Sequence, residues 1–380
     1  WIAIVLGLIS LPVLCWHVRF ALETQRDKQF RVSLAVGKWE GLVERINKEV
    51  PAGAPLLVDT WQRPRTPADQ FNERELAYWV FPRRVYSAAA QRKSGTPLST
   101  LVKRHKIAWG VHGAKLVELD PRTVDQRFSG DEFEEKLPGA TSLVVPVPVE
   151  QPDFYRWSWV LLGLVMYVAA GFGTLHLLGV ARQVSNWWER LALSWLVGLA
   201  VLSLLGLSVF LSGESVRFLR TLVWAMVITV GGAVAAWRRR SDETHPPPSV
   251  SVGRPLVVRL GLGLVITCLL LAAWSGPDGF DQRMQWAYKA RLVLVEPGPF
   301  GDSVFQDDDH VHFHPRYPLL VPVAAATLGS AGGAFNESAY LVLFPLTFAA
   351  AAVMLAGGLR RQGLARTDLG GLILLLVPAW

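Results

Sequence analysis

A short acidic stretch rich in histidine carries the side chains best suited to chemistry. His310, His312 and His314 stand at alternate positions, and Asp307 and Asp309 precede them. In an extended strand, alternate residues project from one face, so the imidazoles would lie together. Imidazole and carboxylate groups bind zinc, manganese and similar divalent cations. The stretch is therefore either a metal or phosphate site, or a hydrated surface loop that binds nothing.

Asp281 is a second candidate, at the start of a stretch that reads as a helix. On that helix Asp281 and Tyr288 share one face, and a catalytic role for the Asp281 carboxylate is one interpretation. An aspartate that follows a glycine and an aromatic residue is also a common helix N-cap, and capping alone would explain it. Lys289 and Arg291 have a similar alternative, because their long side chains can reach a membrane interface.

The composition of the chain is that of a membrane protein. Of its 380 residues, 51% are hydrophobic and only 18% are charged, which is too little charge for the surface of a soluble protein. The net charge of +7 does not indicate nucleic-acid binding, because basic runs such as 238–240 lie beside apolar stretches. Cys15 and Cys268 both lie in apolar stretches, which excludes a disulfide framework and a zinc–thiolate site.

The apolar stretches predict a polytopic α-helical membrane protein with about seven spans, because a span needs about 20 apolar residues. A first span is expected at 1–16, three more within 157–237, and a fifth at 256–274. The last two are expected at 339–359 and 369–380. Since apolar stretches lie at both ends, we expect the natural protein to be longer. The first stretch lacks a signal-peptide cleavage pattern and is expected to be an anchor.

Residues 20–153 have the composition of a soluble domain. A proline- and glycine-containing turn leads into the apolar run 56–58, and 107–119 is rich in strand-forming residues. Residues 72–80 are typical of a helix, and 141–149 of an edge strand interrupted by prolines. We therefore expect a small α/β domain inserted after the first span, which is also the natural place for a protein partner.

The distribution of basic residues predicts the orientation. Residues 238–255 form the most basic short linker and are expected in the cytoplasm. Counting spans from there places 20–153 and the polar loop 275–317 on the extracytoplasmic side.

The apolar stretch 318–331 is expected to be a surface helix and not a span. If it crossed the membrane, Arg360, Arg361 and Arg366 would lie outside, against the positive-inside rule.

The sequence around Asp281 resembles a known family. Residues 279–291 read GFDQRMQWAYKAR after an apolar stretch, and 314–322 read HPRYPLLVP. Both are similar to the GT-C superfamily of integral-membrane glycosyltransferases, and to bacterial members that transfer aminoarabinose or mannose from polyprenyl phosphates. The resemblance covers 256–380. It departs from the family at Gln282, where many relatives carry a second acidic residue.

The resemblance implies a transferase of the bacterial inner membrane that moves a sugar from a polyprenyl-phosphate donor to an extracytoplasmic acceptor. Asp281 matches the catalytic carboxylate of the family. A divalent cation or cationic side chains would stabilise the departing phosphate. The residues expected to bind the substrates are Arg283, Tyr288, Lys289, Arg291, Arg316 and Tyr317.

Two alternatives remain open. The chain could be a non-catalytic membrane subunit or scaffold that docks a partner through 20–153. It could also be a polymerase, ligase or transporter of lipid-linked glycans, although the predicted spans hold few polar residues beyond His176 and Ser203. In every reading the lipid bilayer is a partner and nucleic acid is not.

Overall fold

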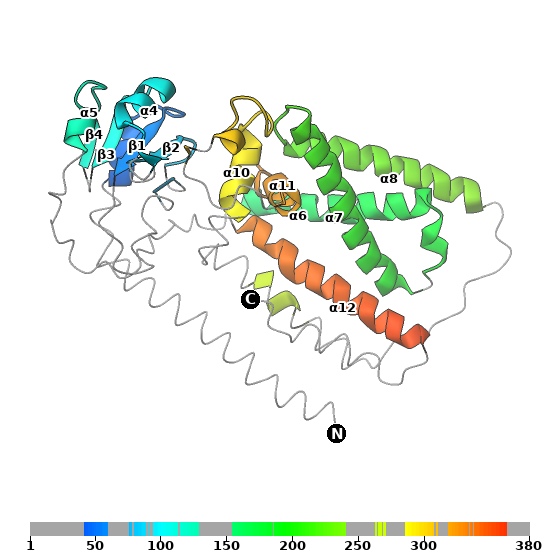
Figure 1. Cartoon of the computed structure of the whole chain (residues 1–380). Helices are drawn as coiled ribbons and strands as arrows, with labels where there is room; N and C mark the ends of the chain where they lie inside the picture. Colours follow the sequence, from blue (N-terminus) through cyan, green and yellow to red (C-terminus); the bar gives the residue numbers. More distant parts are fainter. Residues whose placement is uncertain are drawn as a thin grey trace. The chain divides into compact units, whose positions relative to one another are not determined.

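The computed structural model describes residues 42–59, 76–77, 80–88, 91, 94–112, 115–128, 154–184, 186–240, 263, 265–267, 269–270, 286–307, 309–310, 318–333, 335–336 and 338–362. These residues form two compact units (Figure 1). The first, here called the sheet unit, contains the described residues of 23–150 and 279–317. The second, the helical unit, contains those of 151–278 and 318–380.

The sheet unit is built on four strands: β1 (Leu56–Asp59), β2 (Val85–Ser87), β3 (Trp109–His112) and β4 (Lys115–Glu118). Their order is β2-β1-β3-β4, with β1 parallel to both neighbours and β3 antiparallel to β4. Every residue of β1 is buried, as expected for the continuous apolar run of a central parallel strand. The expected strand at 56–58 and the strand-rich region 107–119 are both confirmed.

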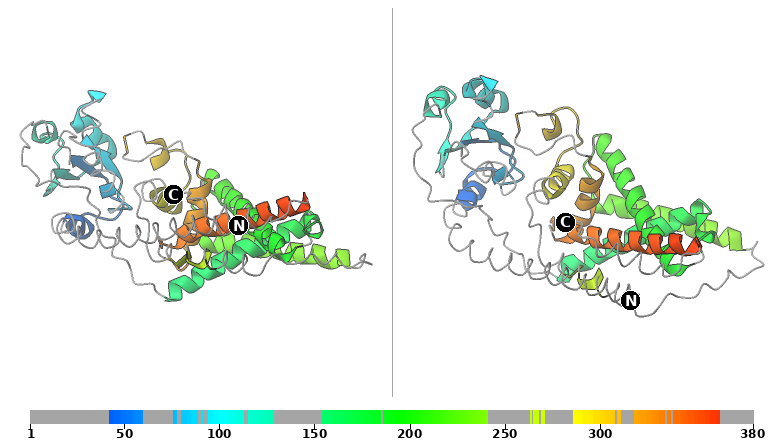
Figure 2. Two further views of the ribbon diagram at one scale, coloured as in Figure 1. Left: turned by 90° about the horizontal axis from the view of Figure 1, so that it is seen from below. Right: turned by 60° about the horizontal axis from the view of Figure 1, so that its bottom comes forward.

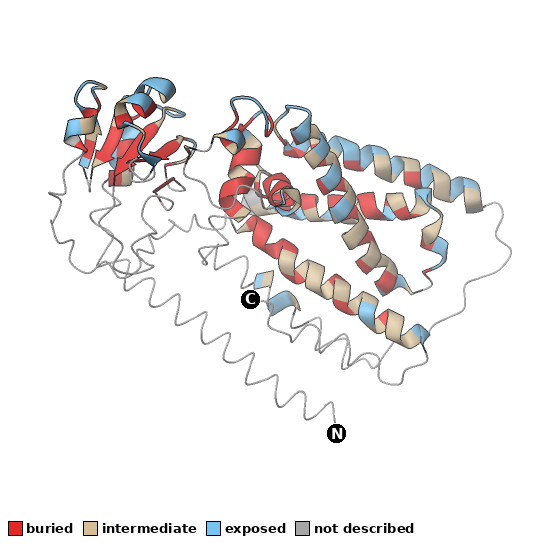
Figure 3. Ribbon diagram, in the orientation of Figure 1, coloured by how far each residue is buried: buried red, intermediate tan, exposed pale blue. Residues whose placement is uncertain are grey.

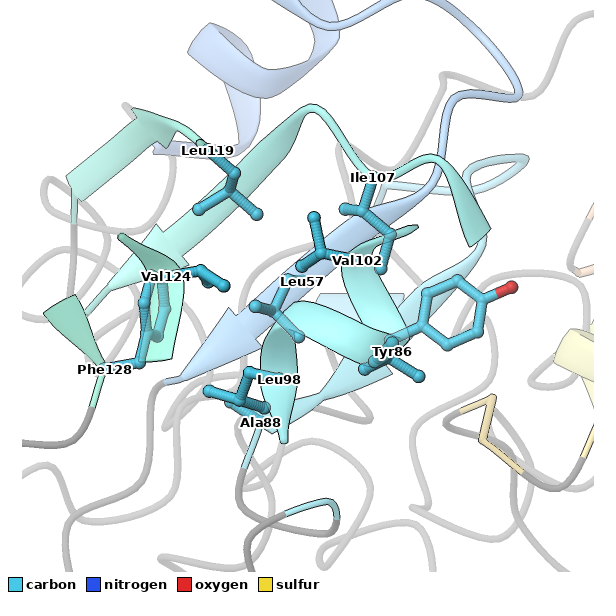
Figure 4. Packing of buried hydrophobic residues seen from close by; sticks show 10 residues of the cluster. Leu57, Tyr86, Ala88, Leu98, Val102, Ile107, Leu119, Val124 and Phe128 are labelled. Carbon is cyan, nitrogen blue, oxygen red and sulfur yellow. The ribbon is translucent and has the colours of Figure 1, made fainter. Parts of the chain in front are cut away.

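Helix α4 (Leu98–His105) supplies much of the apolar core of this unit. Leu98, Leu101 and Val102 form its buried face and pack with Leu57 of β1 and with α5 (Val124–Arg127) (Figure 4). The last turn is basic, which suits the negative end of a helix dipole. The helix stops at Lys106, whose backbone is left-handed (φ 52°).

The structure describes only part of the other secondary structure that was expected in residues 20–153. Residues 76–77 are helical, within the stretch 72–80 that was expected to be a helix. The edge strand expected at 141–149 lies outside the described residues.

The helical unit contains four described helices that are long and apolar enough to cross a membrane. They are α6 (Phe154–Leu177), α7 (Trp187–Leu211), α8 (Phe218–Arg240) and the helix formed by η5 (Ala339–Val342) with α12 (Leu343–Arg361). The expectation of several long apolar helices is therefore confirmed, and their length and composition are those of membrane spans. The spans expected at 1–16 and 369–380 lie outside the described residues, and of 256–274 only 263, 265–267 and 269–270 are described, as helix.

Small residues allow these helices to approach closely. A Cβ atom at Gly171 or Gly198 would overlap the backbone of the other helix where α6 crosses α7. A Cβ atom at Gly232 of α8 would likewise overlap Gly173 of α6. Glycine at such crossings lets backbones meet directly, which is how helices pack where no hydrophobic effect drives them together. Helix α6 thus packs against both α7 and α8 (Figures 1 and 2).

Arginine contacts join the helix ends at one end of this unit. Arg239 near the end of α8 donates to the carbonyl of His176 in α6 at 2.8 Å. Arg361 at the end of α12 pairs with the buried Glu189 at the start of α7. Arg182, in the 3-10 helix η2 (Val180–Arg182) between α6 and α7, donates to the Arg239 carbonyl. Two of these arginines, Arg239 and Arg361, belong to stretches that the positive-inside rule places in the cytoplasm, and both contact a neighbouring helix end.

A short apolar helix, α11 (Leu320–Gly329), lies within the range 318–331 that was expected to be a surface helix. Its ten residues are too few to span a bilayer. It packs against α7, α6 and η5, and its residues from Pro322 to Gly329 are buried (Figure 3).

Candidate functional site

Residues 286–307 and 309–310, here called the 286–310 segment, belong to the sheet unit. The segment contains α10 (Tyr288–Val295) and the short 3-10 helix η4 (Val304–Gln306). It reaches the outer edge of the sheet, where His310 forms an antiparallel bridge with Tyr86 of β2. From the sequence, this loop and the soluble domain were expected to be separate parts, whereas their described residues belong to one compact unit.

Glu296 anchors the middle of the segment. Its buried carboxylate accepts a hydrogen bond from Arg84, beside β2, at 3.3 Å. It also accepts one from the backbone N–H of Val304 at 3.3 Å. One buried acid thus joins the end of α10, the start of η4 and the edge of the sheet.

Asp307 follows η4 and is held in a fixed orientation. The Tyr86 hydroxyl donates to Asp307 Oδ2 at 2.9 Å, and the backbone N–H of Asp309 donates to Oδ1 at 3.1 Å. In Figure 4 the Tyr86 hydroxyl points away from the apolar cluster that buries its ring. Burial, followed by the charge of Asp307, raises the pKa of this hydroxyl, so Tyr86 remains a donor.

Asp309 contacts three side chains of the sheet unit. Gln91 donates to Oδ1 at 2.5 Å, and Arg104 of α4 donates to Oδ2 at 3.0 Å. The imidazole Nε2 of His105, also on α4, lies 3.3 Å from the same Oδ2. His105 lies 3.9 Å from Asp307 through its Nδ1, and its ring packs on Tyr86 with centroids 4.3 Å apart.

One ligand atom each from His105, Asp307 and Asp309 lies within 4.8 Å of the others. This is the mixture of one imidazole and two carboxylates that a divalent cation can use. Asp307 and Asp309 were expected to form such a group, but with other histidines.

His310 is not a member of this ligand group. It is 5% exposed, and its Nε2 is 2.9 Å from the Tyr288 hydroxyl. This nitrogen is therefore already engaged in a hydrogen bond within the protein interior. His312 and His314 lie outside the described residues.

The expected substrate-binding residues are described only in part. Tyr288 and Lys289 on α10 are each 1% exposed, whereas Arg291 is half-buried and lies over the ring of Phe81 at 5.8 Å. Burial, followed by the charge of Glu296, raises the pKa of the Tyr288 hydroxyl. Burial lowers the pKa of the Lys289 ammonium to about 8. Asp281, Arg283, Arg316 and Tyr317 lie outside the described residues.

The residue that sequence reasoning missed is His105. It follows Lys103 and Arg104, and a basic last turn is fully explained by the dipole of α4. Its proximity to Asp307 and Asp309 depends on a contact between residues about 200 positions apart, for which the sequence carries no local signal.

Comparison with protein-family models, with curated protein sequences and with solved structures finds no match for this chain.

Proposed function

We propose that this protein is a membrane glycosyltransferase that moves a sugar from a polyprenyl-phosphate donor to an extracytoplasmic acceptor. The observation that carries the proposal is the resemblance of 279–291 and 314–322 to the GT-C superfamily. Two features of the structure support it. The described helices include four that are apolar enough to cross a membrane, and the short apolar helix α11 begins within the second of these motifs, at Leu320.

The chemistry requires one base and one stabilised leaving group. Asp281 takes the proton of an acceptor hydroxyl as the oxygen forms a bond to the anomeric carbon of the sugar. The bond from that carbon to the phosphate oxygen breaks, and polyprenyl phosphate leaves with the electron pair. Arg283, Arg291 and Arg316 are the cations proposed to stabilise the charge on that phosphate. Inverting transfer needs no second carboxylate, which is compatible with Gln282.

The membrane arrangement is part of the proposal. We propose that the chain crosses the bacterial inner membrane about seven times, through apolar stretches of about the length that a bilayer requires. Leu219, Val230 and Trp237 of α8 are 65%, 63% and 75% exposed, and their side chains are suited to lipid. The helix ends that carry Arg182, Arg239 and Arg361 are proposed to face the cytoplasm, because basic residues favour that side.

Labelling of single cysteines tests the orientation. Cysteines at Gly95 and Gly301 should react with an impermeant reagent in intact spheroplasts, and cysteines at Ser241 and Gln362 should react only after lysis. The opposite pattern at Ser241 and Gly301 would overturn the arrangement.

The Asp281→Asn variant tests the chemistry. Sugar transfer from polyprenyl-phosphate aminoarabinose and polyprenyl-phosphate mannose to membrane lipid acceptors should fall by on the order of 10²-fold or more. Binding of the donor should persist, because the fold and the cations are kept. Asp302→Asn is the matched control, since Asp302 is an exposed acid of the same loop. Full activity of Asp281→Asn, or failure of the protein to bind polyprenyl phosphate, would leave the non-catalytic membrane subunit as the better explanation.

A further inference from the structure

We propose that His105, Asp307 and Asp309 form a divalent-cation site that closes where the 286–310 segment meets α4. The three side chains come from parts of the sequence about 200 residues apart, and their ligand atoms lie within 4.8 Å of one another. The site therefore exists only while the segment is in place on the sheet.

The distances are close to those of a coordinated ion. Ligand atoms about 2.1 Å from a tetrahedral metal lie roughly 3.4 Å from one another. His105 Nε2 and Asp309 Oδ2 are 3.3 Å apart, which already matches this spacing. Asp307 Oδ2 lies 3.9 Å from Nδ1, the other nitrogen of this ring, and a metal takes only one imidazole nitrogen. An ion on Nε2 therefore requires the Asp307 carboxylate to turn toward the side of the ring where Asp309 lies.

Buried polar side chains hold the carboxylates toward this point. Tyr86, 1% exposed, donates to Asp307, and Gln91, 6% exposed, donates to Asp309. Neither donor belongs to the ligand group, and both come from the interior of the sheet unit. Each carboxylate oxygen has two lone pairs, so these hydrogen bonds leave others for a metal. Outer partners of this kind fix the orientation of metal ligands.

Arg104 is the competing cation. Its guanidinium contacts Asp309 Oδ2 at 3.0 Å, but its side chain is 60% exposed, whereas Asp309 is 22% exposed. An exposed ion pair of this type contributes little to stability, because water screens both charges. A divalent ion held by two carboxylates and an imidazole can therefore displace it while the arginine turns to water.

The ligand types indicate which ions fit. An imidazole with two carboxylates suits Zn²⁺ and Mn²⁺ better than Ca²⁺, which takes six to eight oxygen ligands. Three protein ligands leave a position open for water or a phosphate oxygen. That a donor phosphate occupies this position rests on the proposed function, whereas binding of the ion does not.

The experiment measures ion binding to the purified full chain in detergent. Zn²⁺ affinity is measured by competition against a chromophoric chelator, and Mn²⁺ binding is measured separately by electron spin resonance. We expect one ion per chain. His105→Gln and Asp309→Asn should each weaken binding by about 10-fold or more. His112→Gln is the matched control, because His112 lies 3.5 Å from Asp59 in the same unit, away from the ligand group. Its ion affinity should equal that of the wild type.

A spin-echo measurement on the Mn²⁺-loaded wild type covers the case in which a variant fails to fold. It should detect coupling to an imidazole nitrogen. The proposal is overturned if no ion binds, if the bound Mn²⁺ shows no nitrogen coupling, or if His105→Gln binds as tightly as the wild type. If the protein binds the ion but transfers no sugar, the cation site is supported and the glycosyltransferase proposal is contradicted. If it transfers sugar but binds no ion, the glycosyltransferase proposal is supported and the cation site is contradicted.

Discussion

At the scale of single residues, the chemistry of the acidic and histidine-rich stretch was predictable but its partners were not. Asp307 and Asp309 do lie beside an imidazole, as their residue types indicated. Alternation along an extended strand predicted that His310 would join them, yet its imidazole contacts the Tyr288 hydroxyl. Alternation along a strand says which residues share a face, but it does not say which face meets which neighbour. That depends on how the segment packs on the sheet.

Lys289 gives a prediction that depends on pH. Its native pKa of about 8 lies below the ordinary value of 10.5, so the native state disfavours the charged form. The resulting loss of stability, on the order of 1–3 kcal/mol, is complete below pH 8 and disappears as pH rises toward 10.5. We expect Lys289→Met to melt higher than the wild type at pH 7, and the gap to shrink between pH 8 and 10. A difference in melting temperature that does not change with pH would contradict this.

At the scale of elements, the sequence predicted what depends on local pattern. The apolar run of β1 and the long apolar helices α6, α7 and α8 are where hydrophobicity placed them. The crossings between helices were not predicted, because glycines are frequent in these stretches and only the structure shows which of them meet a neighbour. Gly231 and Gly232 of α8 differ in this respect. A Cβ atom at Gly231 would meet only Leu177, at 3.8 Å, whereas one at Gly232 would overlap Gly173.

These neighbouring glycines provide a matched pair of variants. Gly232→Ala should lower stability by roughly 1–3 kcal/mol, because α6 and α8 must move apart. Gly231→Ala should be neutral or slightly stabilising, since alanine favours a helix by about 1 kcal/mol over glycine. The measurement is thermal unfolding of the full chain in one detergent. Equal melting temperatures for the two variants would show that the close crossing of α6 and α8 does not contribute to stability.

At the scale of the whole molecule, each of the two compact units is built from stretches that are far apart in the sequence but in contact in space. The 286–310 segment follows stretches that read as membrane spans, and for that reason the sequence grouped it with the membrane half. Its contacts are instead with the edge of β2, through Tyr86 and Arg84. An uncovered strand edge exposes unpaired backbone groups, so the segment also protects this edge.

The same contacts predict how the sheet unit behaves when it is isolated. A chain of residues 23–150 joined to 279–317 by a flexible linker should be more stable than 23–150 alone. The added part supplies Asp307 to Tyr86 and Glu296 to Arg84, and a hydrogen bond to a charged group contributes about 1.5–3 kcal/mol. Glu296→Gln with Asp307→Asn in the joined chain is the control, and should lower its melting temperature toward that of 23–150. If the joined and the shorter chains melt at the same temperature, the 286–310 segment does not stabilise the sheet.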